Sequence, residues 1–437
     1  MRSARSSLEW ALAVAASLSM AMGCMTVTRS EGADPEDVAV VDAGAADVVS
    51  REAAPPRQDS GGGGQTFVRR PVHCGDAPCV IDLSRSGTTE TFCALVAAEA
   101  EAAPAGRVAC WGWNTGGELG RGKDAGEAPS GQPAFVPGIE DAASLGGSCV
   151  VLADGSVKCW GEGNFLQDGG ALTTPSPVTL PLPPVRRIHG ASDNSICALL
   201  TTGELTCLGA GVSYGRLPDG TFGPFAPTEP TVVTIPPGSR VVDVAADLSR
   251  FALLEGGVVL SWGSWSSLGR VSSLPLDPLP MPIALSNVSS IDAAGGHVCA
   301  VANGHVSCWG QGRHPDQSPP SQPIPEPVPG ISAVVQVSVA STDSGRRGCA
   351  VTDQGDVYCW GANEQGQAGD GTRKFAFFPV KVVGLSGAAV LVRAARSSTC
   401  ALLESGRVEC WGDNTRGALG RGNLGPFELV PAPVKLP

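Results

Sequence analysis

The chain has 437 residues, of which 42% are apolar, so it can bury a core as large as that of one big domain or two ordinary ones. Its 58 glycines and 36 prolines indicate many turns but fall short of the composition of collagen or of a disordered tract. The formal net charge is −12 and the sequence has no basic cluster, which argues against a nucleic-acid partner, because phosphate binding needs clustered lysine and arginine.

Residues 1–24 have the pattern of an export signal. Two arginines near the start are followed by a run from Trp10 to Met22 that is apolar except for two serines. This run is shorter than the roughly 20 residues that a membrane-spanning helix needs. Residues 21–24, Ala-Met-Gly-Cys, resemble the bacterial lipobox, in which the cysteine is acylated after cleavage. We therefore expect a lipoprotein signal peptide and acylation of Cys24; an ordinary secretory signal with an incidental cysteine is the alternative.

Residues 25–65 differ in composition from what precedes and follows them. Eight acidic side chains outnumber three arginines there, a net charge of −5, and the segment also contains Pro55-Pro56 and four consecutive glycines from Gly61. Such a segment cannot bury enough apolar area to offset the entropy that it would lose on ordering. We expect a flexible linker that tethers the rest of the chain.

From residue 66 onward one pattern recurs with a period near 50 residues. Its clearest copy runs from Cys149 to Gly161 and reads Cys-Val-Val-Leu-Ala-Asp-Gly-Ser-Val-Lys-Cys-Trp-Gly. Six further copies begin at Cys93, Cys197, Phe251, Cys299, Cys349 and Cys400. The pairs that end the copies are Trp111-Gly112, Trp160-Gly161, Trp262-Gly263, Trp309-Gly310, Trp360-Gly361 and Trp411-Gly412, with Leu208 replacing Trp in the third copy. A strand-like repeat of this length is typical of a β-propeller or a related array.

Each copy contains a legible β-hairpin. Gly155 stands third in a three-residue loop, the position that adopts a left-handed conformation and favours glycine. This register places Cys149 directly opposite Cys159. The fifth copy is one residue shorter and has the favoured two-residue turn Asn303-Gly304, so its two cysteines again face each other.

The opposed cysteines are predicted to be disulfides. Directly opposed residues of antiparallel strands have Cα atoms about 4.5–5.5 Å apart, within disulfide range. The fourth copy lacks both cysteines at once, carrying Phe251 and Ser261 instead, as expected for bonded partners. Reduced, buried cysteine is the alternative. The predicted bridges are Cys93–Cys110, Cys149–Cys159, Cys197–Cys207, Cys299–Cys308, Cys349–Cys359 and Cys400–Cys410, with the remaining Cys74 and Cys79 as a seventh pair.

A second motif, W-G-x-N-x-x-G-x-L-G-x-G, follows the hairpin. It is complete at Trp111–Gly122 and Trp411–Gly422, and Trp360–Gly371 differs only in having Ala368 for leucine. This string resembles the regulator of chromosome condensation repeat, over roughly residues 66–437. The resemblance implies an all-β fold, a seven-bladed β-propeller whose ring is closed by strands from both chain ends. The segment before Cys93 and residues 434–437 would supply those strands.

No catalytic constellation is recognisable, so no catalytic residue, cofactor or metal is predicted. The histidines lie in no known nucleophile or metal motif: His73, His189, His297, His305 and His314. The position of His297 resembles that of a histidine common in this repeat, which implies a structural role. The founding member of the family exchanges nucleotide on a nuclear small GTPase, but no distinctive exchange motif is present here, and fold alone does not imply function.

We therefore expect an exported, membrane-anchored propeller that acts as a non-catalytic protein-binding scaffold in the cell envelope. It is expected to be a monomer that contacts the membrane only through its lipid, with an unidentified protein partner and no nucleic acid. An exchange-factor-like regulator and a propeller hydrolase or lyase are the alternatives. Aromatic residues in irregular loops are candidate contacts, and blade packing, the commoner role of such residues, is the alternative: Trp113, Tyr214, Trp265 and Phe377.

Overall fold

The structure of the chain is a computed structural model. It describes residues 68–75, 78–86, 89–98, 106–163, 173–190, 195–209, 230–311, 321–342 and 345–437. All of these lie in one compact unit, Gly64–Pro437. The predicted signal peptide, Cys24 and the predicted linker 25–65 lie outside the described residues. Within the described part of the chain, no helix is long and apolar enough to cross a membrane.

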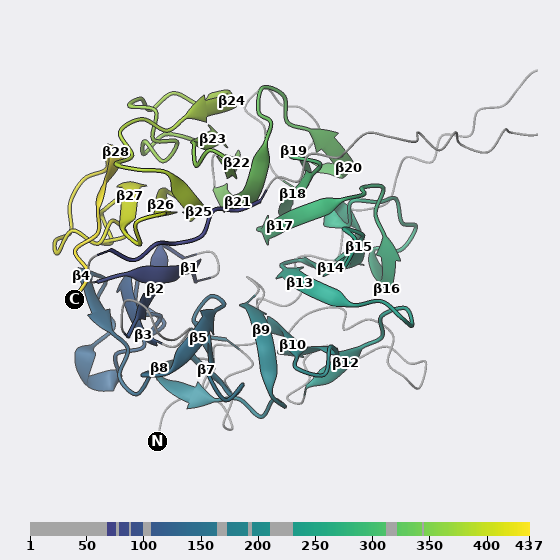
Figure 1. Cartoon of the computed structure of the whole chain (residues 1–437), viewed down its shortest axis with the longest axis horizontal. Helices are drawn as coiled ribbons and strands as arrows, with labels where there is room; N and C mark the ends of the chain where they lie inside the picture. The colour runs from purple at the N-terminus through teal and green to yellow at the C-terminus, as the bar shows by residue number, and fades with distance from the viewer. Residues whose placement is uncertain are drawn as a thin grey trace, which may run out of the picture. The chain divides into compact units, whose positions relative to one another are not determined.

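The described strands are arranged as seven four-stranded blades around a central axis (Figure 1). Five blades are separate sheets, and the first two are joined into one eight-stranded sheet by a single residue pair, Gly106 with Ala142. Every strand pairing within a blade is antiparallel between neighbours in sequence, so each blade is a meander. The all-β propeller predicted from the repeat is therefore the observed fold.

The strands of each blade follow one another from the axis outward. The first two blades contain β1 (Val80–Arg85), β2 (Thr91–Ala97), β3 (Gly106–Gly112), β4 (Ser130–Phe135), β5 (Ala142–Leu145), β6 (Cys149–Leu152), β7 (Val157–Glu162) and β8 (Thr173–Thr179). The third and fourth contain β9 (Val185–Gly190), β10 (Ser195–Leu200), β11 (Leu205–Gly209), β12 (Thr231–Val233), β13 (Val241–Ala246), β14 (Ser249–Leu254), β15 (Val259–Ser264) and β16 (Leu276–Pro282).

The last three blades continue this order. They contain β17 (Val288–Ala294), β18 (His297–Ala302), β19 (His305–Gln311), β20 (Ser321–Pro327), β21 (Val334–Thr342), β22 (Gly345–Thr352), β23 (Val357–Gly361), β24 (Ala376–Lys381), β25 (Ala389–Ala394), β26 (Ser398–Leu403), β27 (Val408–Gly412) and β28 (Glu428–Pro433). Two short 3-10 helices, η1 (Lys123–Ala125) and η3 (Trp265–Ser267), lie in loops.

The hairpin between the second and third strands has the predicted register. The amide of Gly155 donates to the carbonyl of Leu152 at 2.9 Å, and its φ of 84° is the left-handed conformation that glycine adopts without steric cost. Cys149 consequently pairs with Cys159. In the fifth blade Asn303 and Gly304 both have positive φ, as the two-residue turn requires.

Seven disulfides are present among the described residues, and they join the predicted partners. The six hairpin bridges have Cα–Cα distances of 4.0–4.1 Å, and Cys74–Cys79 has 5.6 Å. In the fourth blade Phe251 faces Ser261 in the same register, and its ring meets that of Trp309 edge to face at 5.8 Å. An aromatic contact to the next blade therefore stands where the other hairpins have a covalent bridge.

The loop motif after the hairpin connects neighbouring blades at four of the seven junctions, where the structure describes an indole bond. The Trp160 indole N–H donates to the carbonyl of Glu118 in the preceding blade at 2.8 Å. A Cβ on Gly120, which has a φ of 67°, would lie 2.9 Å from that indole ring. The same bond recurs from Trp309 to Ser267, and from Trp411 to Gln367. The loop motif thus forms a tryptophan socket, that is, a backbone carbonyl that accepts from the indole of the next blade and a glycine that leaves room for its ring.

The same bond closes the ring. Trp111 of the first blade donates to the carbonyl of Ala418 in the last blade at 2.9 Å. Side chains of both blades, among them Leu83 and Leu402, share one buried cluster. The two chain ends therefore meet as neighbouring blades, whereas the family resemblance implied that they share one. The physical reason is that β1 already supplies the first blade's inner strand, and β28 pairs with β27 inside the last blade.

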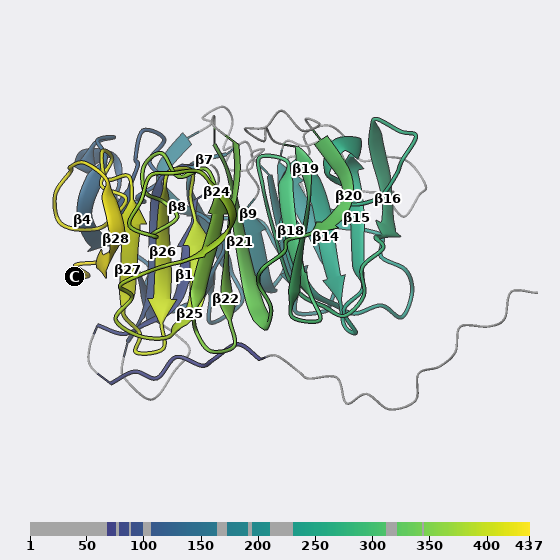
Figure 2. The ribbon, with the colours of Figure 1, turned by 90° about the horizontal axis from the view of Figure 1, so that it is seen from above.

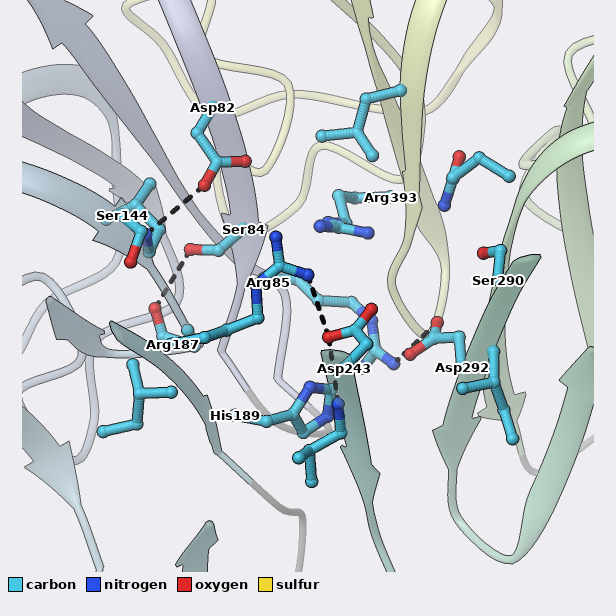
Figure 3. A pocket seen from close by; sticks show the side chains of 18 of the residues that line it. Asp82, Ser84, Arg85, Ser144, Arg187, His189, Asp243, Ser290, Asp292 and Arg393 are labelled. Atoms are coloured by element: carbon cyan, nitrogen blue, oxygen red, sulfur yellow. Dashed lines mark hydrogen bonds and ion pairs between the residues drawn. The ribbon is translucent and has the colours of Figure 1, made fainter. Parts of the chain in front are cut away.

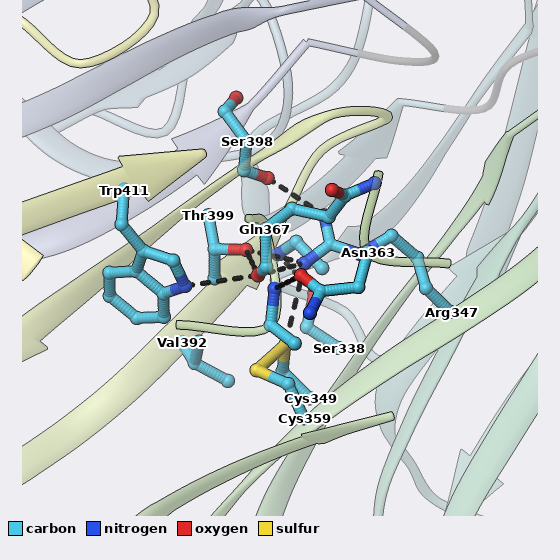
Figure 4. The surroundings of a disulfide bond; sticks show 12 residues. Ser338, Arg347, Cys349, Cys359, Asn363, Gln367, Val392, Ser398, Thr399 and Trp411 are labelled. Carbon is cyan, nitrogen blue, oxygen red and sulfur yellow. Dashed lines mark hydrogen bonds between the residues drawn. A yellow bond between two sulfur atoms is a disulfide. The ribbon is translucent and has the colours of Figure 1, made fainter. Parts of the chain in front are cut away.

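A buried arginine strengthens the seam between the sixth and seventh blades (Figure 4). Arg347, which is 1% exposed, donates to the carbonyls of Ser398 at 2.9 Å and Gln367 at 2.8 Å, close to the Cys349–Cys359 bridge. Burial lowers the pKa of Arg347 to about 9, although the nearby Glu90 opposes this change. The guanidinium therefore remains charged at neutral pH and replaces lost hydration with carbonyl oxygens.

Candidate functional site

The seven inner strands surround a central cavity of about 650 Å³ (Figure 3). Many of the side chains that line this cavity are polar or charged. The charged and imidazole side chains that line it are Arg69, Asp82, Arg85, Arg187, His189, Asp243, Asp292 and Arg393. A cavity of this size falls in the range of small-molecule sites.

Much of this polarity satisfies the edges of the inner strands. An inner strand is the edge of its sheet, so its outward amides lack a ladder partner. Side chains from the preceding blade accept from those amides: Asp82 from Leu145 at 3.3 Å, Ser290 from Val337 at 3.4 Å, and Gln336 from Val392 at 3.0 Å. These polar groups therefore join neighbouring blades at the axis.

Asp292 is the most enclosed carboxylate of the cavity. Its Oδ2 accepts from the Ser338 hydroxyl at 3.0 Å and the Val339 amide at 2.8 Å, and lies 3.5 Å from the Arg85 guanidinium. Burial by itself would raise the pKa of the Asp292 carboxyl, but Arg85, Arg393 and these hydrogen bonds hold it below its usual range. The Arg85–Asp292 pair spans the cavity from the first blade to the fifth.

The other polar groups of the cavity differ in exposure. Arg187 pairs with Asp243 at 2.9 Å, and these side chains are 54% and 33% exposed. Burial lowers the pKa of His189, which keeps its imidazole neutral at pH 7. The hydroxyl of Ser84 donates to the carbonyl of Gly147 at 3.0 Å, so it too serves a contact between blades.

The cavity residues were not predicted from the sequence, although a signal for them exists. His189 and Asp292 lie directly opposite the first cysteines of their hairpins, Cys197 and Cys299. In each case a titratable residue of the inner strand is paired with the first cysteine of the hairpin. Because the hairpin register was known, extending it by one strand would have found this ring of residues.

The two faces of the ring carry different connections (Figure 2). The hairpin-turn face, defined by the turns between second and third strands, carries short connectors such as residues 136–141. The loop face, defined by the connections between third and fourth strands, carries longer segments such as residues 113–129. Sequence also diverges most at the loop face.

A strap of residues 68–75 lies on the hairpin-turn face. Arg70 donates to the Glu404 carboxylate at 2.8 Å and to the carbonyl of Asp353 at 3.0 Å, in the turns of the last two blades. The amide of His73 donates to the Glu404 carbonyl at 2.7 Å. The preceding residues, Val68 and Arg69, line the cavity. The strap thus runs from the axis to the rim (Figure 2).

The structure describes the side chains of two of the four predicted contact residues. Trp113 is half-buried on the loop face, with the Arg416 guanidinium 3.5 Å from its ring centroid. Phe377 is 57% exposed where β24 begins, and its ring centroid lies 4.9 Å from that of Phe375. Trp265 begins η3 on the same face, and Tyr214 lies outside the described residues. The described pair, Trp113 and Phe377, belongs to different blades and forms no single cluster.

One group of side chains has ligand types that suit a metal. His297, Cys299 and Cys308 lie together in the fifth blade. The two sulfur atoms are bonded to each other, and the His297 Nε2 atom lies 3.5 Å from the Cys299 sulfur. Because metal binding requires thiolates, the bonded sulfur atoms are unavailable as ligands in this state.

Together the blades, the bridges and the tryptophan sockets define a disulfide-stapled repeat β-propeller. The family model "Regulator of chromosome condensation (RCC1) repeat" matches residues 334–367 and 354–402. The chain is therefore an RCC1-type repeat propeller.

Curated relatives share the repeat over part of their length. The E3 ubiquitin-protein ligase HERC2 of Mus musculus is 32% identical over 319 residues, which are 67% of this chain but 6% of the ligase. The ultraviolet-B receptor UVR8 of Arabidopsis thaliana is 30% identical over 216 residues, 46% of this chain and 48% of the receptor. The chain thus spans only a small part of the ligase, and the ligase's activity is not carried over.

Solved structures show the same fold. Prp20p of Saccharomyces cerevisiae superimposes with a TM-score of 0.62 at 21% identity, covering 83% of this chain and 90% of Prp20p. Human WBSCR16 gives a TM-score of 0.60 at 19% identity, covering 76% of this chain and 88% of that protein. At this identity the likeness concerns the fold alone.

Proposed function

We propose that this propeller is an exported, lipid-anchored scaffold that binds a protein partner through its loop face, without catalysis. The observation that carries the proposal is the separation of the two faces. The strap that leads back toward Cys24 lies on the hairpin-turn face, and the long, divergent loops lie on the other. A tether through the strap would leave the loop face open to a partner, and rigid scaffolds usually carry their binding function on such loops.

Export is supported by two features. The first 24 residues resemble a lipoprotein signal, and seven disulfides suit an oxidising compartment. A protein partner is supported by the fold relative Prp20p, whose structures are described with binding to Gsp1p and histones and in complex with Kap60. Those partners are properties of Prp20p and identify none for this chain.

The test uses the full-length chain, purified with its disulfides intact and crosslinked to a cell-envelope extract. A captured protein is then purified and titrated against the chain and three variants. Trp113→Ala and Phe377→Ala remove aromatic surface on the loop face. Leu279→Ala, on the outer edge of the fourth blade, is the control because its side chain is similarly exposed at 41%.

Loop-face binding predicts at least about tenfold weaker affinity for one aromatic variant, the loss expected when a contact worth over 1 kcal/mol is truncated. The Leu279→Ala variant should bind like the unmodified chain. If only Leu279→Ala weakens binding, the partner uses the blade edge and the loop-face proposal is wrong. Turnover of a substrate by the purified chain alone would contradict the non-catalytic part.

A further inference from the structure

We propose that the central cavity binds a small anion with carboxylate or phosphate groups, held between the guanidinium groups of Arg69, Arg187 and Arg393. This inference is independent of the loop-face proposal. It rests on an excess of positive charge at the axis, on donors that lack partners, and on the volume available.

The charge at the axis opposes that of the chain. Four arginines line the cavity against three aspartates, whereas the whole chain has a formal net charge of −12. Two of the aspartates are committed to Arg85 and Arg187. The third, Asp82, accepts from the amides of Leu83 and Leu145. Among the described residues, no carboxylate forms a direct ion pair with Arg69 or Arg393, although Asp82 and Asp292 lie near enough to act on their charges.

Arg393 is held so that its donors open into the cavity. Its Nε donates to the carbonyl of Leu83 at 2.8 Å, which fixes the side chain across the seam between the last and first blades. Within the described part of the chain, its two terminal nitrogens have no acceptor. A guanidinium that is anchored through Nε presents this remaining pair of donors in a planar fork, the geometry that binds carboxylate and phosphate in bidentate fashion.

Arg69 approaches the same place from the strap. Arg69 is exposed as a residue, but loss of hydration beside the cavity wall, and then the neighbouring cations Arg393 and Arg187, lower its pKa, while Asp82 opposes them. Arg69, Arg187 and Arg393 all line this one cavity, where their positive charges repel one another. An anion between them would turn this repulsion into attraction, because opposite charges favour each other's ionised form.

The residues that line the cavity also include Ser144. The hydroxyl of Ser144 is buried beside the cavity and has no hydrogen-bond partner among the described residues. The volume of about 650 Å³ accommodates a molecule with two acidic groups.

Calorimetric titration of the full chain with citrate and with inorganic pyrophosphate tests the site and separates carboxylate from phosphate. At low ionic strength we expect saturable binding of at least one probe, with a Kd of about 0.1 mM or tighter. Arg393→Gln and Arg69→Gln should each weaken it about tenfold or more, the loss of one charge-assisted pair. Arg240→Gln is the matched control, because this exposed arginine pairs with Glu255 and does not line the cavity.

Two results would overturn the proposal. One is the lack of saturable binding of either probe at concentrations about 100-fold above the expected Kd. The other is equal weakening by Arg240→Gln and Arg393→Gln, which would mean that the probes respond to general charge. Arg69 has no described hydrogen bond, so Arg69→Gln keeps the test decisive even if Arg393→Gln unfolds the ring.

Discussion

His297 should make the fifth blade sensitive to acid. Its side chain is 2% exposed, and its Nδ1 atom has no hydrogen-bond partner among the described residues. Burial, followed by the nearby Arg346 guanidinium, lowers the pKa of His297 to about 3 from its ordinary 6.5. The folded state therefore keeps the imidazole neutral over a pH range in which the unfolded chain binds a proton.

The sign and size of the effect follow from this difference. A folded-state pKa below the unfolded value contributes stability that is fully present above pH 6.5 and is lost as the pH falls toward 3. At pH 4.5 the unfolded imidazole is almost fully protonated and the folded one almost fully neutral. For a folded pKa of about 3, the loss of unfolding free energy at pH 4.5 relative to pH 7 is about 2.5 kcal/mol.

His297→Gln removes this titration. Urea denaturation at pH 7 and pH 4.5, followed by fluorescence and by amide hydrogen exchange of β18, should show that the variant loses about 2.5 kcal/mol less on acidification than the unmodified chain. The control is His305→Gln, in the same hairpin but exposed, which should leave the acid sensitivity unchanged. If His297→Gln and the unmodified chain lose equal stability on acidification, the buried neutral imidazole is not responsible and the reasoning fails.

Three further predictions concern packing, bridges and export. Gly120→Ala should lower the stability in thermal unfolding by about 2–3 kcal/mol, because the new Cβ would clash with the indole of the next blade and because residue 120 has a positive φ. Gly126→Ala is the control: residue 126 also has a positive φ but has open space around it, so this change should cost only about 1 kcal/mol. Replacing Cys349 and Cys359 together by serine should cost about 2–3 kcal/mol, and peptide mapping of the unmodified protein without reductant should recover that pair; a bridge between repeats would contradict the register. Mass spectrometry of the mature N-terminus should find a diacylated or triacylated Cys24, and an unmodified Cys24 would refute lipid anchoring.

The loop motif shows how far a repeat can be interpreted without a structure. Its tryptophan and glycines were recognisable as packing positions. Their partners were not, because Trp160 contacts a loop 42 residues earlier in the chain. In the ring closure, Trp111 contacts Ala418 across 307 residues. Nothing in a single copy of the repeat distinguishes a contact to its own blade from one to a neighbour.

The candidate contact residues show that the sequence does not predict which loop aromatics are exposed. Trp113 and Phe377 were selected because aromatic residues in irregular loops often anchor interfaces. The structure shows that Trp113 is partly covered by Arg416, a residue of the last blade, whereas Phe377 is largely exposed. Exposure depends on which loops become neighbours around the ring, and that is decided by blade packing.

By itself, the sequence determined the hairpins, their register and their cysteine pairs, because turn glycines and a two-residue side-chain alternation act over about ten residues. It also predicted seven repeats, a number that agrees with the described sheets. Only the tertiary structure decided that the first and last blades meet as complete sheets, that the strap and the long loops lie on opposite faces, and that Arg69 and Arg393 face one cavity. Each of these features combines residues from distant copies of the repeat. They therefore arise only when the ring closes and brings groups that are far apart in the sequence next to one another.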